Sequence, residues 1–322
     1  MMMNFNVRSN ERNYETYYDV IIIGAGAAGY SAGIYIKRSG LSVAILEREA
    51  VPGGNTAVSP LVENYLGYKA INGTDLAENF RKHYSEYGKI ITEIDVRDIK
   101  KDGDKFLIET NREEFTAKAV IIATGTTHRK MNVKGEDTYF GKGISYCSTC
   151  DGYLFKDKSV AVMGGGDSGA ISALYLKGIA KNVSIVSHSK IKKCEEAYIK
   201  EIDEKKIPFL LNSETEEFVG DGKKLTGIKY MNTETNSEET ISVDGAFVYI
   251  GVIPQTSFLK NIGVNLDKQG FIIADEKGRT SVPGIYAAGD VIMGSEEQIA
   301  TAVGDGSRAA ITLYMDKMNK KF

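Results

Sequence analysis

The sequence predicts an α/β protein with two Rossmann-like nucleotide-binding domains, doubly wound and of the three-layer ββα kind, the second inserted in the first. Two observations carry this prediction. A strand, a glycine-rich turn, a helix and a second strand follow one another twice along the chain. The chain also holds 34 glycines against 5 prolines, which indicates many tight turns and close backbone approaches.

The composition bounds the class of protein. A chain of 322 residues corresponds to about two domains of ~100–200 residues each. With 42% hydrophobic and 26% charged residues it can bury an ordinary core. The net charge of −3 favours neither nucleic acid nor a membrane surface as a partner. No apolar run reaches the ~18 residues of a membrane span. Residues 1–18 are too polar for a signal peptide, so we expect a cytoplasmic protein with a solvated N-terminal arm.

The first copy of the motif starts with the apolar run Asp19–Ile23. The turn Gly24–Gly29 follows, then a helix to Arg38 and a second strand, Val43–Leu46. In a G-x-G-x-x-G turn the first glycine makes the bend, the second lets the backbone reach a pyrophosphate, and the third packs helix against strand. The N–H groups at the start of the helix then favour a bound phosphate.

The second copy repeats this order with the strand Ser159–Met163, the turn Gly164–Gly169, a helix to Lys177 and the strand Val183–Val186. A lone glycine motif is weak evidence, but two copies in the full strand–turn–helix–strand context are specific. We therefore predict a cradle for a dinucleotide in each domain.

The remaining elements place the second copy inside the first domain. Residues 130–255 form the insertion, and residues 1–129 and 256–322 together form the outer domain. The other predicted elements are a helix over Thr74–Tyr87, a buried strand within Val120–Gly125, a hairpin tip at Thr233–Thr240, a glycine turn at Ala287–Asp290, and a closing helix with its apolar face at Ala302, Ala309, Ile311 and Leu313.

Acidic residues indicate the cofactor of the outer domain. Glu47 ends the second strand about 20 residues beyond the glycine turn, where a carboxylate suits the ribose hydroxyls of FAD or NAD. Asp290, after a later glycine turn, is a second candidate, for ribitol hydroxyls. In the inserted domain the corresponding positions carry neither an acidic residue nor Arg. His188 there could stack on an adenine, and the lysines between residues 190 and 193 form either a solvated face or a surface for an acidic electron-carrier protein.

The pair Cys147 and Cys150 is the chemical centre of the sequence. Two intervening residues let the sulfurs form and break a disulfide within one turn. Asp151 directly after them is placed for general acid–base catalysis. A zinc half-site is the main alternative, but only Cys194 and three unpaired histidines remain as ligands, so we expect no metal. We expect Cys194 to be a small residue at the start of a helix.

Taken together, these motifs resemble those of the low-molecular-weight thioredoxin reductases over nearly the whole chain. The segments that carry the resemblance are the first glycine turn with Glu47, Gly53–Asn55, Val62–Tyr65, Ala123–Gly125, Cys147–Gly152, the second glycine turn and Tyr286–Asp290.

This resemblance implies FAD in the outer domain, a homodimer, and an inner domain that swings to present the cysteine pair alternately to the flavin and to thioredoxin or a thioredoxin-like protein. It further implies that Cys150 is the thiol on the flavin side, Cys147 the one that attacks thioredoxin, and Asp151 the acid. The residues that it assigns to FAD are Gly24, Gly26, Ala27, Ala28, Gly29, Glu47, Arg48, Gly53, Gly54, Asn55, Asn64, Val96, Ala123, Thr124, Gly125, Gly289, Asp290, Gln298, Ile299 and Ala300. Those of a second nucleotide site are Gly164, Gly166, Asp167, Ser168, Gly169 and His188.

The chain departs from this pattern where NADPH-using members bind the 2′-phosphate. Those members have His-Arg-Arg and a further Arg four residues on, whereas this chain has Ser187, His188, Ser189 and Lys193. Glu297 also stands where an Arg is usual. The chain thus resembles archaeal members with a degenerate pyridine-nucleotide site, and weak or absent use of NADPH is expected, with NADH, ferredoxin or a deazaflavin as other donors.

Two other functions are compatible with parts of the pattern. A flavoprotein of the same fold could serve as a ferredoxin–NADP reductase, which has no use for the cysteine pair, or as a flavin oxidase. A nucleotide-sensing module with a metal-bound cysteine pair would be colourless, whereas a flavoprotein is yellow.

Overall fold

A computed structural model describes residues 14–59 and 62–320 of the protein. The chain forms two compact units. The first unit comprises Met1–Ala57, Leu76–Gly125 and Pro254–Phe322, and the second comprises Val58–Asp75 and Thr126–Ile253. Most of the predicted N-terminal arm lies outside the described residues. At its end the ring of Tyr14 stacks on Phe115.

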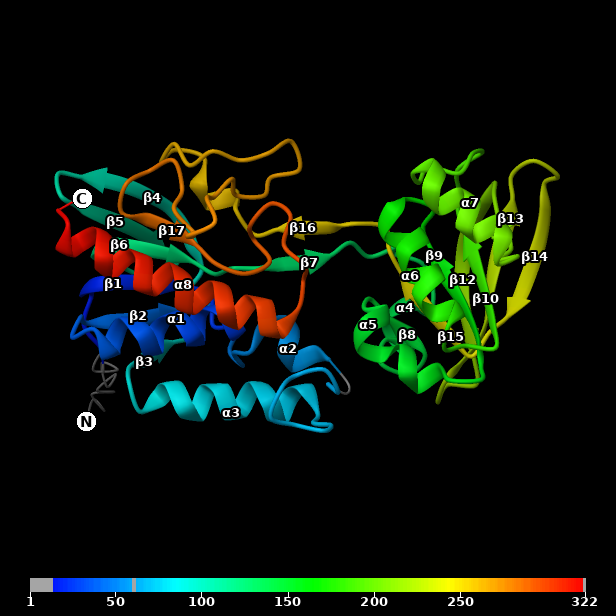
Figure 1. Ribbon diagram of the computed structural model, residues 1–322, viewed down its shortest axis with the longest axis horizontal. Coiled ribbons are helices and arrows are strands. Elements are labelled where there is room, and N and C mark those ends of the chain that lie inside the picture. Colours follow the sequence, from blue (N-terminus) through cyan, green and yellow to red (C-terminus); the bar gives the residue numbers. More distant parts are fainter. Residues whose placement is uncertain (1–13, 60–61, 321–322) are drawn as a thin grey trace, which may run out of the picture. The chain divides into compact units, whose positions relative to one another are not determined.

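The first unit is built on a seven-stranded sheet in the order β3-β2-β1-β6-β5-β4, with β17 also paired to β6 (Figure 1). Strands β1, β2, β3, β6 and β17 pair in parallel, and β4 and β5 add an antiparallel edge. The strands are β1 (Tyr17–Ile23), β2 (Val43–Leu46), β3 (Lys89–Ile91), β4 (Val96–Asp102), β5 (Lys105–Thr110), β6 (Glu114–Ile122) and β17 (Ile285–Ala287). The helices are α1 (Ala27–Arg38), α2 (Gly54–Val58), α3 (Gly73–Ser85) and α8 (Ile299–Met318), with the 3-10 turn η2 (Ser257–Leu259).

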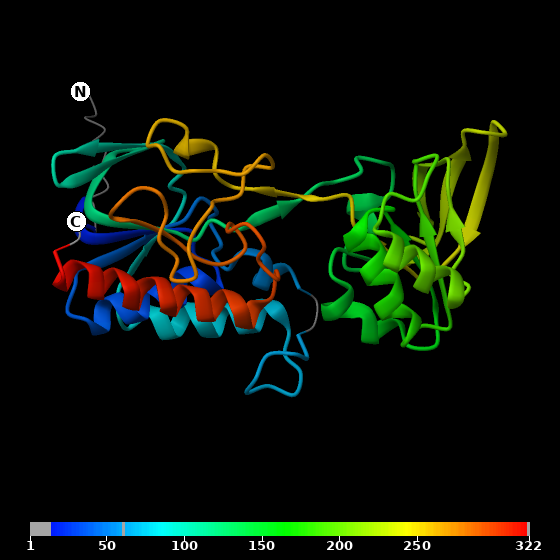
Figure 2. The same ribbon diagram turned by 45° about the horizontal axis from the view of Figure 1, so that its top comes forward.

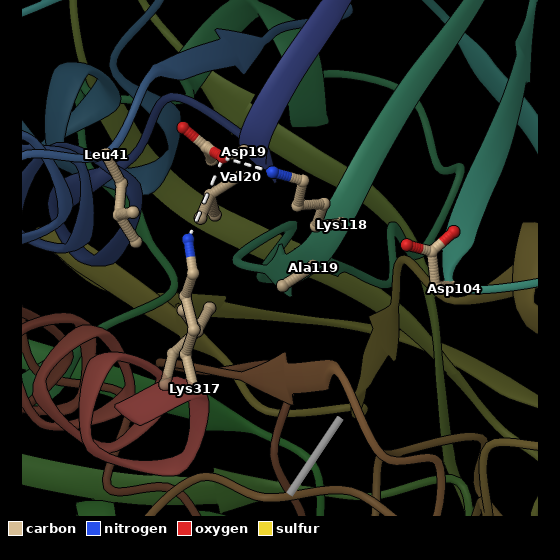
Figure 3. A pocket seen from close by; sticks show the side chains of 8 residues that line it. Asp19, Val20, Leu41, Asp104, Lys118, Ala119 and Lys317 are labelled. Carbon is tan, nitrogen blue, oxygen red and sulfur yellow. Dashed lines mark hydrogen bonds and ion pairs between the residues drawn. The ribbon is translucent and has the colours of Figure 1, made fainter. Parts of the chain in front are cut away.

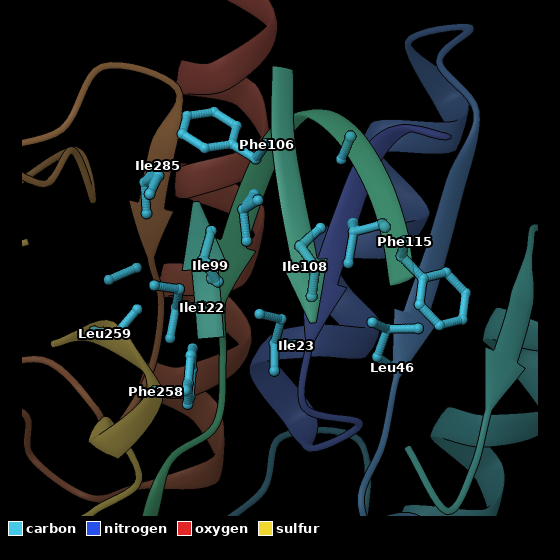
Figure 4. Close-up of a cluster of buried hydrophobic side chains, with 14 of the residues drawn as sticks. Ile23, Leu46, Ile99, Phe106, Ile108, Phe115, Ile122, Phe258, Leu259 and Ile285 are labelled. Carbon is cyan, nitrogen blue, oxygen red and sulfur yellow. The ribbon is translucent and has the colours of Figure 1, made fainter. Parts of the chain in front are cut away.

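Both faces of this sheet are buried, which is why its strands are continuous apolar runs. Successive residues of a strand point to opposite faces, and Ile21 and Ile23 of β1 belong to one core while Val20 and Ile22 belong to the other. The first core includes the aromatic rings of β5, β6 and η2 (Figure 4). The second core lies under α1 and α8, which run side by side (Figures 1 and 2).

The apolar face predicted for the closing helix is wrong at one position. Ala302, Ala309 and Leu313 of α8 are buried, but Ile311 is 49% exposed. Each residue turns the helix by about 100°, so Ile311 lies roughly 200° around the axis from Ala309. Its side chain therefore projects away from the face that packs on α1.

The second unit has three layers. The central layer is a parallel sheet in the order β11-β10-β9-β15-β8. The antiparallel sheet β12-β13-β14 covers one face of it, and helices cover the other. The strands are β8 (Ile144–Ser145), β9 (Ser159–Met163), β10 (Asn182–Val186), β11 (Phe209–Leu210), β12 (Ser213–Gly220), β13 (Leu225–Asn232), β14 (Ser237–Ser242) and β15 (Gly245–Val248). The helical elements are α4 (Glu136–Tyr139), α5 (Ser148–Asp151), η1 (Gly152–Phe155), α6 (Asp167–Lys177) and α7 (Glu196–Glu204).

Alternation along β9 again separates two cores. Val160 and Val162 pack with the helices, and Ala161 and Met163 pack with the antiparallel sheet. The strands β7 (Thr126–His128) and β16 (Val252–Pro254), which lie at two of the places where the chain passes from one unit to the other, pair with each other. The predicted fold class, a doubly wound α/β protein with two Rossmann-like folds, is confirmed. Among the described residues no helix combines the length and the apolar character needed to cross a membrane.

Asp19 joins three elements at the start of β1 (Figure 3). Its carboxylate accepts hydrogen bonds from Ser42 N (3.0 Å), Ser42 Oγ (2.9 Å) and Lys118 Nζ (3.1 Å), and Lys317 Nζ of α8 lies 3.8 Å away. Burial alone would raise the pKa of Asp19, but the hydrogen bonds from Ser42 and Lys118 outweigh it and lower the pKa to about 2.

We expect Asp19→Asn to lower the free energy of unfolding at pH 7 by about 1–2 kcal/mol, since each lost pKa unit is worth ~1.4 kcal/mol before solvent screening. A carboxylate with a depressed native pKa stabilises the fold above its unfolded pKa. The difference between the two proteins should therefore shrink as the pH falls from about 4 to 2. Urea unfolding followed by circular dichroism at several pH values measures it. A difference that stays constant down to pH 2 would contradict this role.

Candidate functional site

The first glycine turn leaves the start of α1 open. Gly24 has φ +105°, and a Cβ there would clash with the carbonyl oxygen of Ala123, the residue directly after β6. A Cβ on Gly29 would clash with the carbonyl of Gly24, whereas one on Gly26 would meet no atom within 4 Å. The turn is thus pressed against the neighbouring strand on one side and accessible at Gly26 on the other. This is the geometry that admits a pyrophosphate at a helix N-terminus.

Glu47 holds its carboxylate beside this turn. One oxygen accepts the N–H of Ala25 at 2.7 Å and the other accepts the N–H of Glu49 at 2.9 Å. Each carboxylate oxygen has a further lone-pair direction, so hydroxyl groups of a ligand can still donate to it. The guanidinium of Arg48 next to it contacts the side-chain oxygen of Gln255 at 3.1 Å.

Two more predicted segments converge on the same turn. A Cβ on Gly54 would lie 3.4 Å from Gly26 Cα, and one on Gly289 would lie 3.0 Å from Ala28 Cβ. The helix α8, which begins at Ile299, approaches there too, because a Cβ on Gly306 would clash with the carbonyl of Ala28. The structure therefore brings together residues that are widely separated in sequence.

Asp290, one residue further on, is a half-buried carboxyl group with a perturbed pKa. Burial raises its pKa to about 6, against hydrogen bonds from Ser295 and Asn55. Burial also raises the pKa of Asp305 in α8, which the sequence did not single out. Asp290 and Asp305 are thus two acidic side chains near one glycine turn whose pKa burial raises.

Other predicted residues lie around this centre or apart from it. Thr124 donates its hydroxyl to the carbonyl of Gln255 at 2.7 Å, and Gln298 is the N-cap of α8. Val96 opens β4 and packs against the first core. Asn64 is exposed in the segment Val58–Asp75, which groups with the second unit and not with the turn.

Cys147 and Cys150 form a disulfide at the start of α5, with their Cα atoms 5.3 Å apart. Both residues are half-buried. The sulfur of Cys147 accepts the N–H of Cys150 at 3.1 Å and lies 3.3 Å from the hydroxyl of Thr149. These donors would stabilise negative charge on the Cys147 sulfur after reduction, which favours it as the attacking thiolate.

Asp151 follows the disulfide and is only 5% exposed. Burial raises the pKa of Asp151 to about 6, while a hydrogen bond from the hydroxyl of Ser145 lowers it. Its Oδ2 accepts that bond at 2.6 Å. A carboxyl group of this kind is partly protonated near neutral pH and can both give and take a proton.

Tyr249 anchors the turn of the disulfide from another strand. Its hydroxyl accepts the N–H of Ser148 at 2.7 Å and donates to Ser148 Oγ at 2.9 Å. Sequence reasoning missed this residue, although a tyrosine at the carboxyl end of a buried strand, β15, was a usable signal. Sequence reasoning also missed Ser145.

A second polar group lies just before the cysteines. Glu136 is 2% exposed and accepts hydrogen bonds from Met131 N (2.9 Å), Asn132 N (2.8 Å) and the hydroxyl of Tyr146 (2.8 Å). The ring of Tyr146 stacks on His128 at 4.7 Å, and burial lowers the pKa of that histidine. These contacts fix the chain that leads into Cys147.

Among residues 14–59 and 62–320, no three His, Cys, Asp or Glu side chains gather in a way that could hold a metal ion. Cys194 is a free thiol buried in the core beneath α6 and α7, and it precedes the start of α7 by two residues.

The second glycine turn repeats the geometry of the first. Gly164 has φ +124°, and a Cβ there would clash with the carbonyl of Tyr249. A Cβ on Gly169 would clash with the carbonyl of Gly164, and one on Gly166 would meet no atom within 4 Å. This turn therefore offers the same open helix start.

The loop after β10 closes over this second turn. Lys193 N donates to the carbonyl of Gly165 at 3.2 Å, and Glu195 N donates to Asp167 Oδ1 at 2.7 Å. His188 is exposed, and Lys192 is paired with Asp203 at 2.5 Å. Ser168 lies in the first turn of α6.

The chain is similar to known proteins over most of its length. Residues 18–306 match the model of the family described as pyridine nucleotide-disulphide oxidoreductase. A thioredoxin reductase of Listeria monocytogenes is 41% identical over 297 residues, 92% of each chain. The crystal structure of T. acidophilum thioredoxin reductase is 55% identical, covers 94% of this chain and 100% of that one, and has a TM-score of 0.67. A thioredoxin reductase structure from Streptococcus pyogenes is 36% identical, covers 95% and 100%, and has a TM-score of 0.89.

The chain belongs to the family of pyridine nucleotide-disulphide oxidoreductases. Within this family it is an enzyme, a flavoprotein oxidoreductase, and it groups with the low-molecular-weight thioredoxin reductases. The predicted family and enzyme class are thereby confirmed.

We expect Asp151→Asn to stabilise the oxidised protein at pH 8 by about 1–3 kcal/mol, because the native state then no longer holds a buried charge. A carboxyl group with a raised native pKa contributes stability that is complete below its unfolded pKa of about 4 and is lost as the pH rises through about 6. The gain should vanish near pH 4. Urea midpoints of both proteins at pH 4 and 8 provide the measurement, and an equal midpoint at pH 8 would speak against burial as the cause.

Proposed function

We propose that this protein is an FAD-dependent thioredoxin-disulfide reductase. Electrons pass from a donor to FAD, then to Cys147–Cys150, and then to thioredoxin or a thioredoxin-like protein. One observation carries the proposal: a half-buried disulfide within a single turn is followed directly by the buried Asp151, whose pKa lies at about 6. This turn combines a reversible sulfur pair with a proton donor poised near neutral pH.

The first unit supports FAD as the cofactor. Gly26 leaves the start of α1 open for the pyrophosphate, and Glu47 presents carboxylate oxygens to ribose hydroxyls beside it. Gly54 and Gly289 bring two further loops to the same turn, and Asp290 follows for the ribitol chain. When bound, FAD would supply the capacity to take electrons from the donor and reduce the disulfide, which the side chains here do not provide.

The exchange with the acceptor needs only the turn's own groups. The thiolate of Cys147 attacks one sulfur of the acceptor disulfide, a mixed disulfide forms, and the leaving sulfur takes the proton of Asp151. The thiol of Cys150 then passes its proton to Asp151 as its sulfur attacks Cys147. The Cys147–Cys150 bond re-forms, and the second acceptor sulfur leaves with that proton. Two electrons and two protons reach the acceptor.

We further propose that residues 1–129 and 256–322 are the FAD-binding domain and that residues 130–255 present the dithiol. The paired segments β7 and β16 lie beside both connections between these two domains. A swing of the inner domain in a homodimer would let one disulfide serve FAD and the acceptor in turn.

The electron donor is proposed to be something other than NADPH. The loop after β10 holds Ser187 and Ser189 buried, while Lys192 is paired with Asp203 and covers the ring of Phe209 at 5.7 Å. No Arg stands in this loop to form a bidentate contact with a 2′-phosphate. NADH, a ferredoxin or another electron carrier fits these residues better.

We expect Cys150→Ser and Cys147→Ser to abolish thioredoxin reduction, because either change removes one sulfur of the exchanging pair. Flavin content should remain that of the unaltered protein. Insulin turbidity with added thioredoxin and a chemical reductant for the flavin measures the activity. Cys194→Ala, which alters the free buried thiol, is the matched control and should keep full turnover. Turnover by the Cys150→Ser protein would reject the sulfur pair as the route.

We expect NADPH to bleach the flavin at least about tenfold more slowly than the best of NADH, reduced ferredoxin and a reduced deazaflavin. Two absent Arg–phosphate contacts, at about 1.5–3 kcal/mol each, account for a loss of this size. Anaerobic stopped-flow absorbance of the flavin gives the rates. Rapid stoichiometric bleaching by NADPH would overturn the proposed donor.

A further inference from the structure

Ser145 connects the two chemical groups of the turn. It ends β8, two residues before Cys147, and is 5% exposed. Its hydroxyl donates to Asp151 Oδ2 at 2.6 Å, and its oxygen accepts the N–H of Cys147 at 3.0 Å. The carbonyl oxygen of Cys147 lies 3.3 Å from the Ser145 hydroxyl, so the carboxylate is the nearer of the two acceptors for the single hydroxyl proton. One side chain thereby ties the carboxyl group to the backbone of the nucleophile.

The two oxygens of Asp151 have different surroundings. Oδ2 accepts the bond from Ser145, whereas Oδ1 is buried and has no hydrogen-bond partner among residues 14–59 and 62–320. A buried oxygen without a partner is costly when it carries charge and much less so when it is a hydroxyl group. The acid proton therefore belongs on Oδ1, the oxygen that no hydrogen bond occupies.

We propose that Ser145 is a positioning residue for proton transfer by Asp151: its hydrogen bond to Oδ2 fixes the carboxyl group so that Oδ1 carries the proton and delivers it to the leaving thiolate. The inference rests on the proposed function. In the step, the electron pair of the Cys147 thiolate forms the new S–S bond, the acceptor S–S bond breaks, and its leaving sulfur takes the proton from Oδ1. When the sulfur of Cys150 attacks Cys147, the Cys147–Cys150 bond forms and the bond from Cys147 to the acceptor breaks. The thiol proton of Cys150 passes through Oδ1 to the second leaving sulfur.

The electrostatics agree with this geometry. Burial raises the pKa of Asp151, and the bond from Ser145 is what lowers it again, to about 6. The titratable residues of η1 and α6, the elements that pack against α5, are Tyr153, Asp167, Tyr175 and Lys177, and none of them contributes to this pKa. Removal of the hydroxyl should thus raise the pKa of Asp151.

Ser148 provides a matched control on the same turn. It is also buried, at 3% exposure, but its Oγ accepts from Tyr249 and has no bond to Asp151. Ser145→Ala and Ser148→Ala therefore remove the same group from the same turn, and only the first touches the acid. Ser145→Thr keeps a hydroxyl and tests rescue.

The test uses two small disulfides that differ in their need for an acid. The full protein is reduced with dithionite under argon, and its oxidation by bis(2-hydroxyethyl) disulfide or by 5,5′-dithiobis(2-nitrobenzoate) is followed by stopped flow from pH 5 to 9. An alkyl thiolate leaves poorly without a proton, whereas the aromatic thiolate leaves readily without one.

With the alkyl disulfide, Ser145→Ala should react about tenfold more slowly near pH 7, part of the 10²–10⁴ that a general acid contributes. Its rate should also start to fall at a higher pH than that of the unaltered protein, since the rate depends on the protonated acid. With the aromatic disulfide, the rate should change less than about twofold. Ser148→Ala removes a bond from Tyr249, so it should slow the reaction with both disulfides to the same extent and leave unchanged the pH at which the rate with the alkyl disulfide falls. Ser145→Thr should keep the original pH profile, and Asp151→Asn should lose this pH dependence.

Two results would overturn the inference: identical pH profiles for Ser145→Ala and the unaltered protein, or equal slowing with both disulfides, which indicates only a disturbed turn. Circular dichroism and flavin content verify that each variant is folded, and Ser145→Thr decides the question should the alanine variant unfold. If the unaltered dithiol reacts with neither disulfide, the proposed function itself fails. If it reacts and Ser145→Ala behaves identically, only the role of Ser145 fails.

Discussion

The close approach of backbone to backbone at the two glycine turns is the constraint on which the rest of the structure depends. At Gly24 and at Gly164 the chain leaves a buried strand with positive φ and lies directly against the carbonyl of a neighbouring segment, Ala123 or Tyr249. A side chain at either position would push the following helix away from the sheet. The helix start would then no longer face the edge where the strands end. Each unit's candidate site exists because its helix is held that close.

The same constraint links the second turn to the disulfide. Tyr249, whose carbonyl lies over Gly164, is also the residue whose hydroxyl holds Ser148 at the start of α5. The polypeptide that shapes the nucleotide cradle therefore also positions the sulfur pair. This explains how a helix of four residues can present Cys147 and Cys150 in one orientation. It also explains why Asp151 can be buried beside them. The packing of the sheet offsets the free-energy cost of burying its carboxyl group.

The sequence was sufficient for the parts of the fold that follow from local patterns. Strands buried on both faces are continuous apolar runs, so β2 and β9 could be predicted from their first to their last residue. The glycine spacing predicted both turns for a mechanical reason. The face of α8 was harder, because small residues such as Gly306 make its contact with α1, and Ile311 attracted attention only by its hydrophobicity.

Contacts between residues far apart in sequence were beyond such reasoning. Tyr249 and Ser148 are 101 positions apart, and nothing in either segment alone indicates the other. Ser145 was hidden for a different reason. A serine six residues before an aspartate is unremarkable until the chain bends back and buries both. The orientation of a proposed acid is a tertiary property, whereas the identity of the acid is visible in the sequence next to the cysteines.

The difference between the two cradles shows where donor choice is decided. Both turns have the same backbone form, so phosphate recognition alone cannot distinguish them. In the first, Ala25 follows the first glycine and Glu47 accepts its N–H. In the second turn, Gly165 takes the place of Ala25, because a Cβ there would meet Ser187 Oγ at 2.7 Å. The loop after β10 also donates a hydrogen bond to the carbonyl of Gly165. The loop after β10, which begins with the short Ser187, therefore lies closer to its glycine turn than the loop after β2, which begins with the longer Glu47. A ligand entering the second cradle would meet backbone and hydroxyl groups in place of a carboxylate or an arginine. Its phosphates would be held while its ribose would not be discriminated, and a donor that transfers electrons without using this cradle would lose nothing by the change.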